Sequence, residues 1–294
     1  MRHKMTAIAA SLLVGIVAGC GGSGSSGTAT TSISGKVADG YLAGATVFLD
    51  RNGNYQPDPG EPSTTTDANG AFTVKIDAAD MGKYPLVAMA MKGQTIDRDT
   101  GLSVADSFVM SMPAGAMAGT VGSNFISPMS TLLREKMAAN PTMTLNEAMT
   151  QLRNQMNLPA GMEMTADYMA AALSGTNGAN YQAMHAIAQQ MASLMAGQAP
   201  LVMNGSSVNV NRYREMMALI NSNMSGITAN VMGGLGMTSP FMTTMMSQMQ
   251  ALLGTMPVSG GFANYSGMFR NMTSQRSFWS GTGTPITPMS GGMM

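Results

Sequence analysis

The hydrophobic pattern of this chain changes its period once, near residue 124, and this change constrains the fold more than any other feature. Before it, short runs of alternating apolar and polar residues are separated by turn-forming residues, which predicts β-strands. After it, apolar residues recur every three or four positions, which predicts amphipathic helices. We therefore predict a multidomain protein in which a β-domain precedes an α-domain.

The β-domain is predicted over residues 33–113. Its candidate strands are short, and turn signals such as Asn69-Gly70 separate them, because this pair tolerates positive φ. Several short strands with frequent turns predict a small antiparallel β-sandwich. The candidate strands are residues 33–37, 45–49, 71–76, 86–91 and 104–112.

The α-domain is predicted over residues 124–257 as a helical bundle. Each predicted helix begins at a residue whose side chain can accept a hydrogen bond from the first turn. These predicted starts are Ser127-Pro128, the capping box Thr144 with Glu147, Asn180, Asn211 and Ser239-Pro240. Residues 258–294 are rich in Gly, Ser, Thr and Met without a period, and we predict a disordered tail.

Composition differs between the two predicted domains. Ten of the 15 acidic residues lie between Asp39 and Asp106, whereas 33 of the 35 methionines lie from Met81 onward. The formal net charge is zero, so there is no basic excess of the kind that nucleic-acid binding requires. The difference in composition supports two domains. The absence of a basic excess excludes a nucleic-acid partner.

The N-terminus is typical of a targeting segment. Arg2, His3 and Lys4 precede an apolar stretch over residues 6–17, which is too short to span a bilayer as a mature helix. The stretch ends in Val17-Ala18-Gly19-Cys20, which resembles the bacterial lipobox. The resemblance implies a signal peptide over residues 1–19 and lipidation of Cys20 with fatty acids such as palmitate. The alternative is an ordinary signal peptide with a chance cysteine.

Residues 20–32 support the lipid anchor, because a Gly/Ser/Thr-rich segment is a flexible tether. Gly21, rather than an acidic residue, follows Cys20, which favours the outer membrane or the cell surface. Since Cys20 is the only cysteine, we expect no disulfide and no cysteine metal site in the mature protein.

The segment Asp50–Glu61 has the spacing of a calcium-binding loop. Side chains that carry oxygen recur at loop positions 1, 3, 5, 9 and 12, and Gln56 at position 7 can offer its carbonyl, which is how a twelve-residue loop surrounds one Ca²⁺. Tyr55 stands where such loops have glycine, and a predicted strand precedes the loop, so we expect a clamp between strands rather than a helix–loop–helix hand. The alternative is a solvated turn without metal. The candidate ligands are Asp50, Asn52, Asn54, Gln56, Asp58 and Glu61.

The same region resembles a family of folds. Residues 35–42, residues 44–50 and residues 65–72 are similar to prealbumin-like β-sandwiches, which include carboxypeptidase-regulatory-like domains, Cna-type B repeats and calcium-loop adhesin B repeats. The resemblance covers residues 33–80. It implies a stalk, spacer or accessory module rather than a catalyst.

The methionines permit two interpretations. The sulfurs of Met242, Met245 and Met249 recur on one predicted helical face, where thioethers could bind Cu(I) or Ag(I). The same spacing is what a buried core stripe requires, and methionine fills cores as leucine does. We favour core packing and keep a methionine-rich Cu(I)/Ag(I)-binding envelope protein as the alternative function.

His185 is the only histidine outside the predicted signal peptide, and no nucleophile motif accompanies it. We therefore predict no catalytic residues. The predicted function is that of a non-enzymatic, lipid-anchored cell-envelope protein with a structural or binding role and a calcium-stabilised loop. Its expected contact is the membrane, through the anchor at Cys20; the sequence does not indicate a further protein or cell-wall partner.

Overall fold

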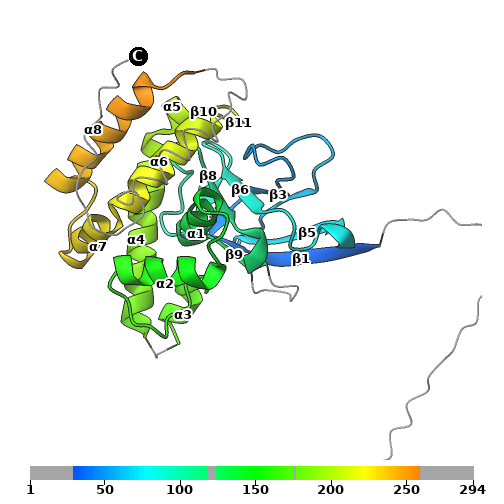
Figure 1. Ribbon diagram of the computed structural model, residues 1–294, viewed down its shortest axis with the longest axis horizontal. Coiled ribbons are helices and arrows are strands. Elements are labelled where there is room, and N and C mark those ends of the chain that lie inside the picture. Colours follow the sequence, from blue (N-terminus) through cyan, green and yellow to red (C-terminus); the bar gives the residue numbers. More distant parts are fainter. Residues whose placement is uncertain (1–28, 118–123, 175–176, 259–294) are drawn as a thin grey trace, which may run out of the picture.

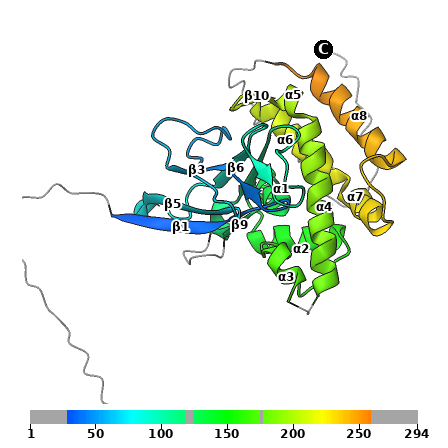
Figure 2. The same ribbon diagram turned by 180° about the vertical axis from the view of Figure 1, so that it is seen from behind.

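The computed structural model describes residues 29–117, 124–174 and 177–258. Strands dominate its N-terminal half and helices its C-terminal half, as the change of hydrophobic period predicts. Figures 1 and 2 show the strands on one side of the molecule and the helices on the other, with α7 and α8 far from β1. Cys20 and residues 259–294 lie outside the described residues, so the predicted anchor and most of the predicted tail do too.

Four strands form an antiparallel sheet in the order β4 (Ser63–Thr65), β3 (Thr46–Leu49), β6 (Leu86–Ala90) and β8 (Phe108–Met112). β3, β6 and β8 fall within three of the predicted strands. All five residues of β6 and all five of β8 are buried. Burial on both faces explains why β6 is a continuous apolar run rather than an alternating one.

The second sheet has the order β5 (Ala71–Asp77), β1 (Thr30–Val37) and β9 (Asn124–Ile126). β1 and β5 are antiparallel, but β9 runs parallel to β1. The prediction of a purely antiparallel β-domain is therefore wrong for this pair. β9 was not predicted, because its three residues are too few to establish a period. Gly35 permits the close approach of β9, since a Cβ there would lie 2.0 Å from the Asn124 carbonyl oxygen.

Two smaller ladders complete the strands. β2 (Leu42–Ala43) pairs with β7 (Ile96–Asp97), and β10 (Met203–Asn204) pairs with β11 (Ser207–Val208). Two short 3₁₀ helices, η1 (Ala78–Asp80) and η2 (Ala114–Ala116), follow β5 and β8. Within the described residues, neither small ladder has a third strand.

Three helices begin where the sequence predicts. They are α1 (Pro128–Ala139), α2 (Leu145–Gln155) and α8 (Pro240–Thr255). Ser127, Thr144 and Ser239 cap them, each accepting a hydrogen bond from a backbone N–H in the first turn. These caps were predictable because capping depends on residues that are adjacent in sequence.

Two other helices begin earlier than predicted. α4 (Gly178–Gly197) follows Asn177 and not Asn180, and α6 (Val210–Ser222) is capped by Asn209 and not by Asn211. Each segment holds several asparagines, and only the observed chain path decides which one stands at the end. α3 (Tyr168–Ala172), α5 (Ala199–Val202) and α7 (Met224–Met232) were not predicted.

One continuous cluster of buried apolar side chains extends from Ile33 in β1 to Leu253 in α8. α1 lies at its centre and contacts β8, β9, α2, α4 and α6. Leu132 and Leu133 on α1 are fully buried. Sheets and helices therefore share one core. In the part of the chain that the structure describes, no helix is long and apolar enough to cross a bilayer.

Candidate functional site

The loop Asp50–Glu61 leaves β3 and turns back before β4. Its first side chain organises the turn: Asp50 Oδ1 accepts hydrogen bonds from the N–H of Gly53 at 2.8 Å and of Asn54 at 3.1 Å. Asp50 Oδ2 accepts from the N–H of Tyr55 at 3.3 Å. This arrangement is an extended form of the Asx turn, in which a short carboxylate satisfies the backbone of the residues that follow it.

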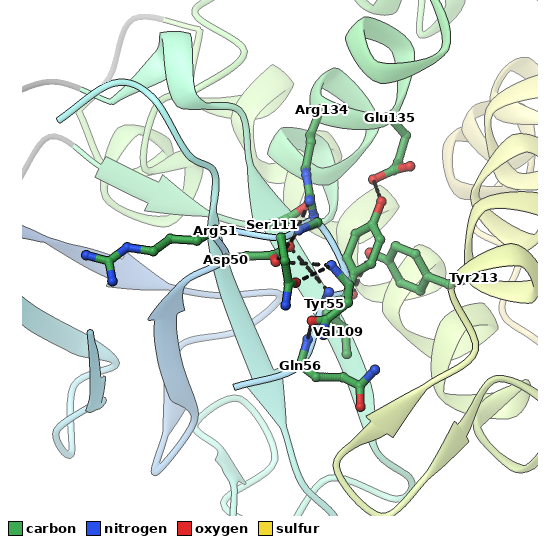
Figure 3. Close-up of polar contacts among 12 residues, drawn as sticks. Asp50, Arg51, Tyr55, Gln56, Val109, Ser111, Arg134, Glu135 and Tyr213 are labelled. Atoms are coloured by element: carbon green, nitrogen blue, oxygen red, sulfur yellow. Dashed lines mark hydrogen bonds and ion pairs between the residues drawn. The ribbon is translucent and has the colours of Figure 1, made fainter. Parts of the chain in front are cut away.

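Asp50 also pairs with a residue from the helices. Arg134 Nη2, from α1, donates to Asp50 Oδ2 at 3.0 Å, and the Asp50 side chain has no exposed surface. Figure 3 shows the guanidinium reaching down from α1 to this carboxylate. A buried carboxylate needs such a partner, because an uncompensated charge in the interior is strongly destabilising.

Tyr55 is inserted between the loop and the helices and is fully buried. Its hydroxyl donates to Glu135 Oε1 of α1 at 2.7 Å, and its ring lies 4.0 Å from the Arg134 guanidinium carbon. The ring of Tyr213, from α6, lies 4.4 Å away between centroids. These contacts are visible in Figure 3, where Tyr55 projects from the loop toward Glu135 and Tyr213. Tyr55 thus fastens the loop to two helices.

The backbone of Tyr55 has φ of 64°, in the left-handed region that glycine normally occupies. A non-glycine residue there costs about 1 kcal/mol or more, and the buried contacts of the ring offset this cost. Burial, followed by the nearby Glu135, raises the pKa of the Tyr55 hydroxyl. The hydroxyl therefore stays protonated and donates at any ordinary pH.

Further hydrogen bonds join the loop and its partner Tyr213 to other elements of the molecule. Tyr213 donates its hydroxyl to the Val109 carbonyl of β8 at 3.0 Å, and Gln56 Nε2 donates to the Val208 carbonyl of β11 at 3.5 Å. On the opposite side, Arg51 Nε donates to Asp80 Oδ2 of η1 at 3.1 Å. The loop is therefore held from the strand side and from the helix side.

The remaining predicted ligands bond within the loop. Asn52 Nδ2 and Asn54 Nδ2 each donate to Asp58 Oδ2 at 2.7 Å, so these three side chains meet at one point. Glu61 does not join them: its two oxygens accept from the N–H of Arg51 at 2.6 Å and of Asp58 at 3.2 Å.

The loop is thus only a partial match to a calcium site. Positions 3, 5 and 9 come together, whereas Asp50 at position 1 faces Arg134 and Glu61 at position 12 faces the backbone. The positive charge of Arg134 beside Asp50 disfavours a cation at the first ligand position. Across residues 29–117, 124–174 and 177–258, no three acidic, His or Cys side chains gather closely enough to hold a metal ion. Calcium binding stays a prediction.

The methionine stripe of α8 packs into the core. Met242, Met245 and Met249 are 0%, 3% and 1% exposed. Sulfurs buried in this way contribute packing, and Cu(I) or Ag(I) could reach them only if α8 moved. Cu(I)/Ag(I) binding likewise stays a prediction.

His185, on α4, lies beside Asp99, with 2.7 Å between Nε2 and Oδ2. Its ring stacks on Tyr168 of α3 at 5.7 Å. No local pattern predicts this acidic neighbour, because Asp99 lies far from His185 in the sequence.

Sequence reasoning also missed Arg134, Glu135 and Tyr213 as partners of the loop. One signal was present: Arg134-Glu135-Lys136 interrupts the apolar face of α1, and all three residues are buried. Charges on the buried side of a helix require partners from elsewhere in the fold. The second signal was Tyr55 itself, a bulky residue at a position that favours glycine.

In comparisons with known proteins, no family model, no characterised protein and no solved structure matches this chain.

Proposed function

We propose that this protein is a non-enzymatic, lipid-anchored component of the cell envelope with a structural or binding role. The observation that carries the structural role is the burial of Tyr55 between Arg134 and Tyr213, because it makes the most motif-like loop of the chain an internal brace. A loop fastened on both sides suits a rigid module better than a switch. The targeting segment and Cys20 support export and anchoring.

The finer fold assignment is part of the same proposal. We assign the two sheets to a prealbumin-like β-sandwich of the kind found in Cna-type B repeats and carboxypeptidase-regulatory-like domains. The four-stranded antiparallel sheet β4-β3-β6-β8 supports it, together with the antiparallel pair β1 and β5. An experimental structure compared with such sandwiches would test the assignment.

The anchor can be tested by growing cells with an alkyne-tagged palmitate. We expect the wild-type protein to incorporate the label and to partition into a detergent phase, and the Cys20→Ala variant to do neither. Ser23→Ala, in the predicted tether, is the matched control and keeps both properties. A wild-type protein that is processed and exported without label would exclude the lipid anchor.

Calcium stabilisation of the loop is a separate proposal. Melting with and without about 1 mM Ca²⁺ tests it, since a ligand that binds only the folded state raises Tm. Asp58→Asn is the informative variant, because Asp58 is partly exposed and lies where Asn52 and Asn54 meet. Asp50→Ala would confuse the result by leaving Arg134 buried without its partner. An unchanged wild-type Tm would exclude calcium and leave the brace intact.

The Cu(I)/Ag(I) alternative is tested by anaerobic titration of the whole protein against a competing chelator. Because the α8 methionines are buried, binding there would also lower the stability of the fold. Failure to compete for Cu(I) would remove this alternative.

A further inference from the structure

A second cluster of ionisable residues lies at another junction between strands and helices, away from the loop. It is centred on Asp39, in the corner between β1 and β2. Asp39 is partly exposed as a residue, but its Oδ1 atom is buried and has no hydrogen-bond partner among the described residues. A buried carboxylate oxygen without a donor is costly when it is charged.

Two more carboxylates face the same corner. A Cβ placed on Gly40 would lie 2.6 Å from Asp97 Oδ1 and 2.6 Å from Asp99 Oδ2. Because both lie 2.6 Å from the same point, Asp97 Oδ1 and Asp99 Oδ2 are at most 2 × 2.6 Å apart. Asp39 precedes Gly40 in the chain, and the charges of Asp97 and Asp99 both act on its carboxyl group, so the three carboxylates repel one another when all are charged.

Helix α4 supplies the groups that oppose Asp99. Gln189 Nε2 donates to Asp99 Oδ2 at 2.7 Å, and His185 Nε2 lies 2.7 Å from the same oxygen. The His185 contact does not have the alignment of a hydrogen bond. Asp99 is thus compensated from α4, whereas Asp39 is not.

Helix α3 contacts the corner through two residues. The Tyr168 hydroxyl donates to the Ala38 carbonyl at 2.9 Å and approaches the Asp39 carbonyl at 3.3 Å. The neighbouring Asp167 accepts from Lys36 Nζ at 3.2 Å and from the Tyr41 hydroxyl. The charge of Lys36 is therefore directed to Asp167 rather than to Asp39.

We propose that Asp39, Asp97, Asp99 and His185, which we call the acidic corner, form a proton-sensitive joint between the strand-rich half and helices α3 and α4. The joint is closed while Asp39 keeps its proton and opens when the proton is lost. The elements that meet there are short, with five residues in α3 and two each in β2 and β7. Short elements open at lower free energy than the central strands do.

The protonation of Asp39 supports the closed state near neutral pH. Burial, then the charges of Asp97 and Asp99, raise the pKa of Asp39 to about 8, although the N–H groups of Asp39 and Gly40 act in the opposite direction. In the unfolded chain the group titrates near 3.8. The folded state therefore binds the extra proton between these two values, and stability decreases as pH rises from about 4 to about 8.

Hydrogen exchange of the full chain at pH 6 and pH 9, corrected for intrinsic rates, tests the proposal. We expect the α3 amides of the wild type to lose roughly a hundredfold in protection between pH 6 and pH 9, since the deprotonated form of Asp39 rises from about 1% two units below the pKa to about 90% one unit above it. The Asp39→Asn variant has no carboxyl proton to lose, so its α3 amides should be protected at pH 9 as they are at pH 6. Asp106→Asn, an exposed acid paired with Lys92, is the matched control and behaves as the wild type does.

Carboxyl ¹³C NMR of Asp39 in the wild type is the second measurement, and it needs no variant to fold. A titration midpoint near 8 that moves down in Asp97→Asn supports the joint. A midpoint near 4 overturns it, as does wild-type α3 protection that is unchanged at pH 9. The same pH dependence in Asp39→Asn as in the wild type would overturn it too.

Discussion

At the residue scale, Tyr55 reconciles two opposing demands. Its backbone adopts a left-handed conformation that disfavours any side chain other than hydrogen, yet its ring fills a buried space between Arg134 and Tyr213. A tyrosine ring that is fully buried stabilises a fold by several kcal/mol, which exceeds the backbone cost. The packing of the Tyr55 ring therefore outweighs the local preference for glycine at this position.

The Tyr55 hydroxyl should be separable from its ring. Tyr55→Phe keeps the ring and removes the bond to Glu135, so we expect a loss of about 1–3 kcal/mol in the free energy of unfolding. Tyr55→Ala also removes the packing, and we expect about 3–5 kcal/mol. Urea unfolding measures both. Tyr84→Phe, at a partly exposed position, serves as the control. Equal stability of Tyr55→Phe and the wild type would contradict the role of Glu135.

Lys136 provides a pH-dependent prediction at the same scale. It is fully buried, and burial lowers its pKa to about 8 from 10.5. Between these values the unfolded state binds more protons than the folded state, so this group makes stability rise with pH over that range. Lys136→Met should therefore remove this rise, so the stability of the variant relative to the wild type should fall between pH 8 and pH 10.5.

Melting from pH 7 to pH 10.5 checks this prediction, with Lys83→Met at an exposed position as the control. A difference in stability between Lys136→Met and the wild type that stays constant over the whole pH range would show that the effect is packing and not charge. The direction is opposite to that expected for Asp39, where stability decreases as pH rises from about 4 to about 8.

At the element scale, α1 is the helix that joins the two halves. Its apolar face packs on β8, and its Thr131 hydroxyl accepts a hydrogen bond from the Ser111 N–H of that strand at 2.9 Å. Its Arg134 and Glu135 hold the loop that follows β3. One helix thus contacts the central sheet through apolar residues and the loop through charged ones.

The helix caps offer a prediction at this scale. Ser239 accepts a hydrogen bond from the Met242 N–H at the start of α8. Ser239→Ala should cost about 1 kcal/mol, because one N–H of the first turn loses its partner. Ser247→Ala, within the same helix on its exposed side, should change stability by less. Thermal melting compares the two variants, and equal losses would show that the cap contributes nothing specific.

At the scale of the whole molecule, the buried cluster crosses from sheets to helices without a break. Ion pairs cross the same boundary at the loop, between Arg134 and Asp50, and near the acidic corner, between Lys36 and Asp167. Contacts of this kind couple the stability of one half to that of the other.

We therefore expect a single cooperative transition for the two halves. Far-ultraviolet circular dichroism and tyrosine fluorescence should give coincident urea curves, and the calorimetric and van't Hoff enthalpies should agree. Two separate transitions would mean that the strands and helices fold independently, and that the shared core contributes little.

Local features of the structure followed from the sequence because they depend on neighbouring residues. The alternation around Phe72 predicted β5, and the serine–proline pairs at Ser127 and Ser239 predicted the starts of α1 and α8. The Asp50–Glu61 loop was recognised as a unit for the same reason: its bonds among Asn52, Asn54 and Asp58 join residues close in sequence.

The contacts of this loop with the helices depend on tertiary packing. Arg134 lies 84 positions from Asp50, and Glu135 lies 80 positions from Tyr55. No local propensity or spacing encodes such pairs, because they form only when α1 packs against the loop that follows β3. The sequence alone predicts that strands precede helices and that Asp50–Glu61 forms one loop. The packing of α1 and α6 made that loop a brace, since only packing could bring an arginine to Asp50 and a buried site to Tyr55.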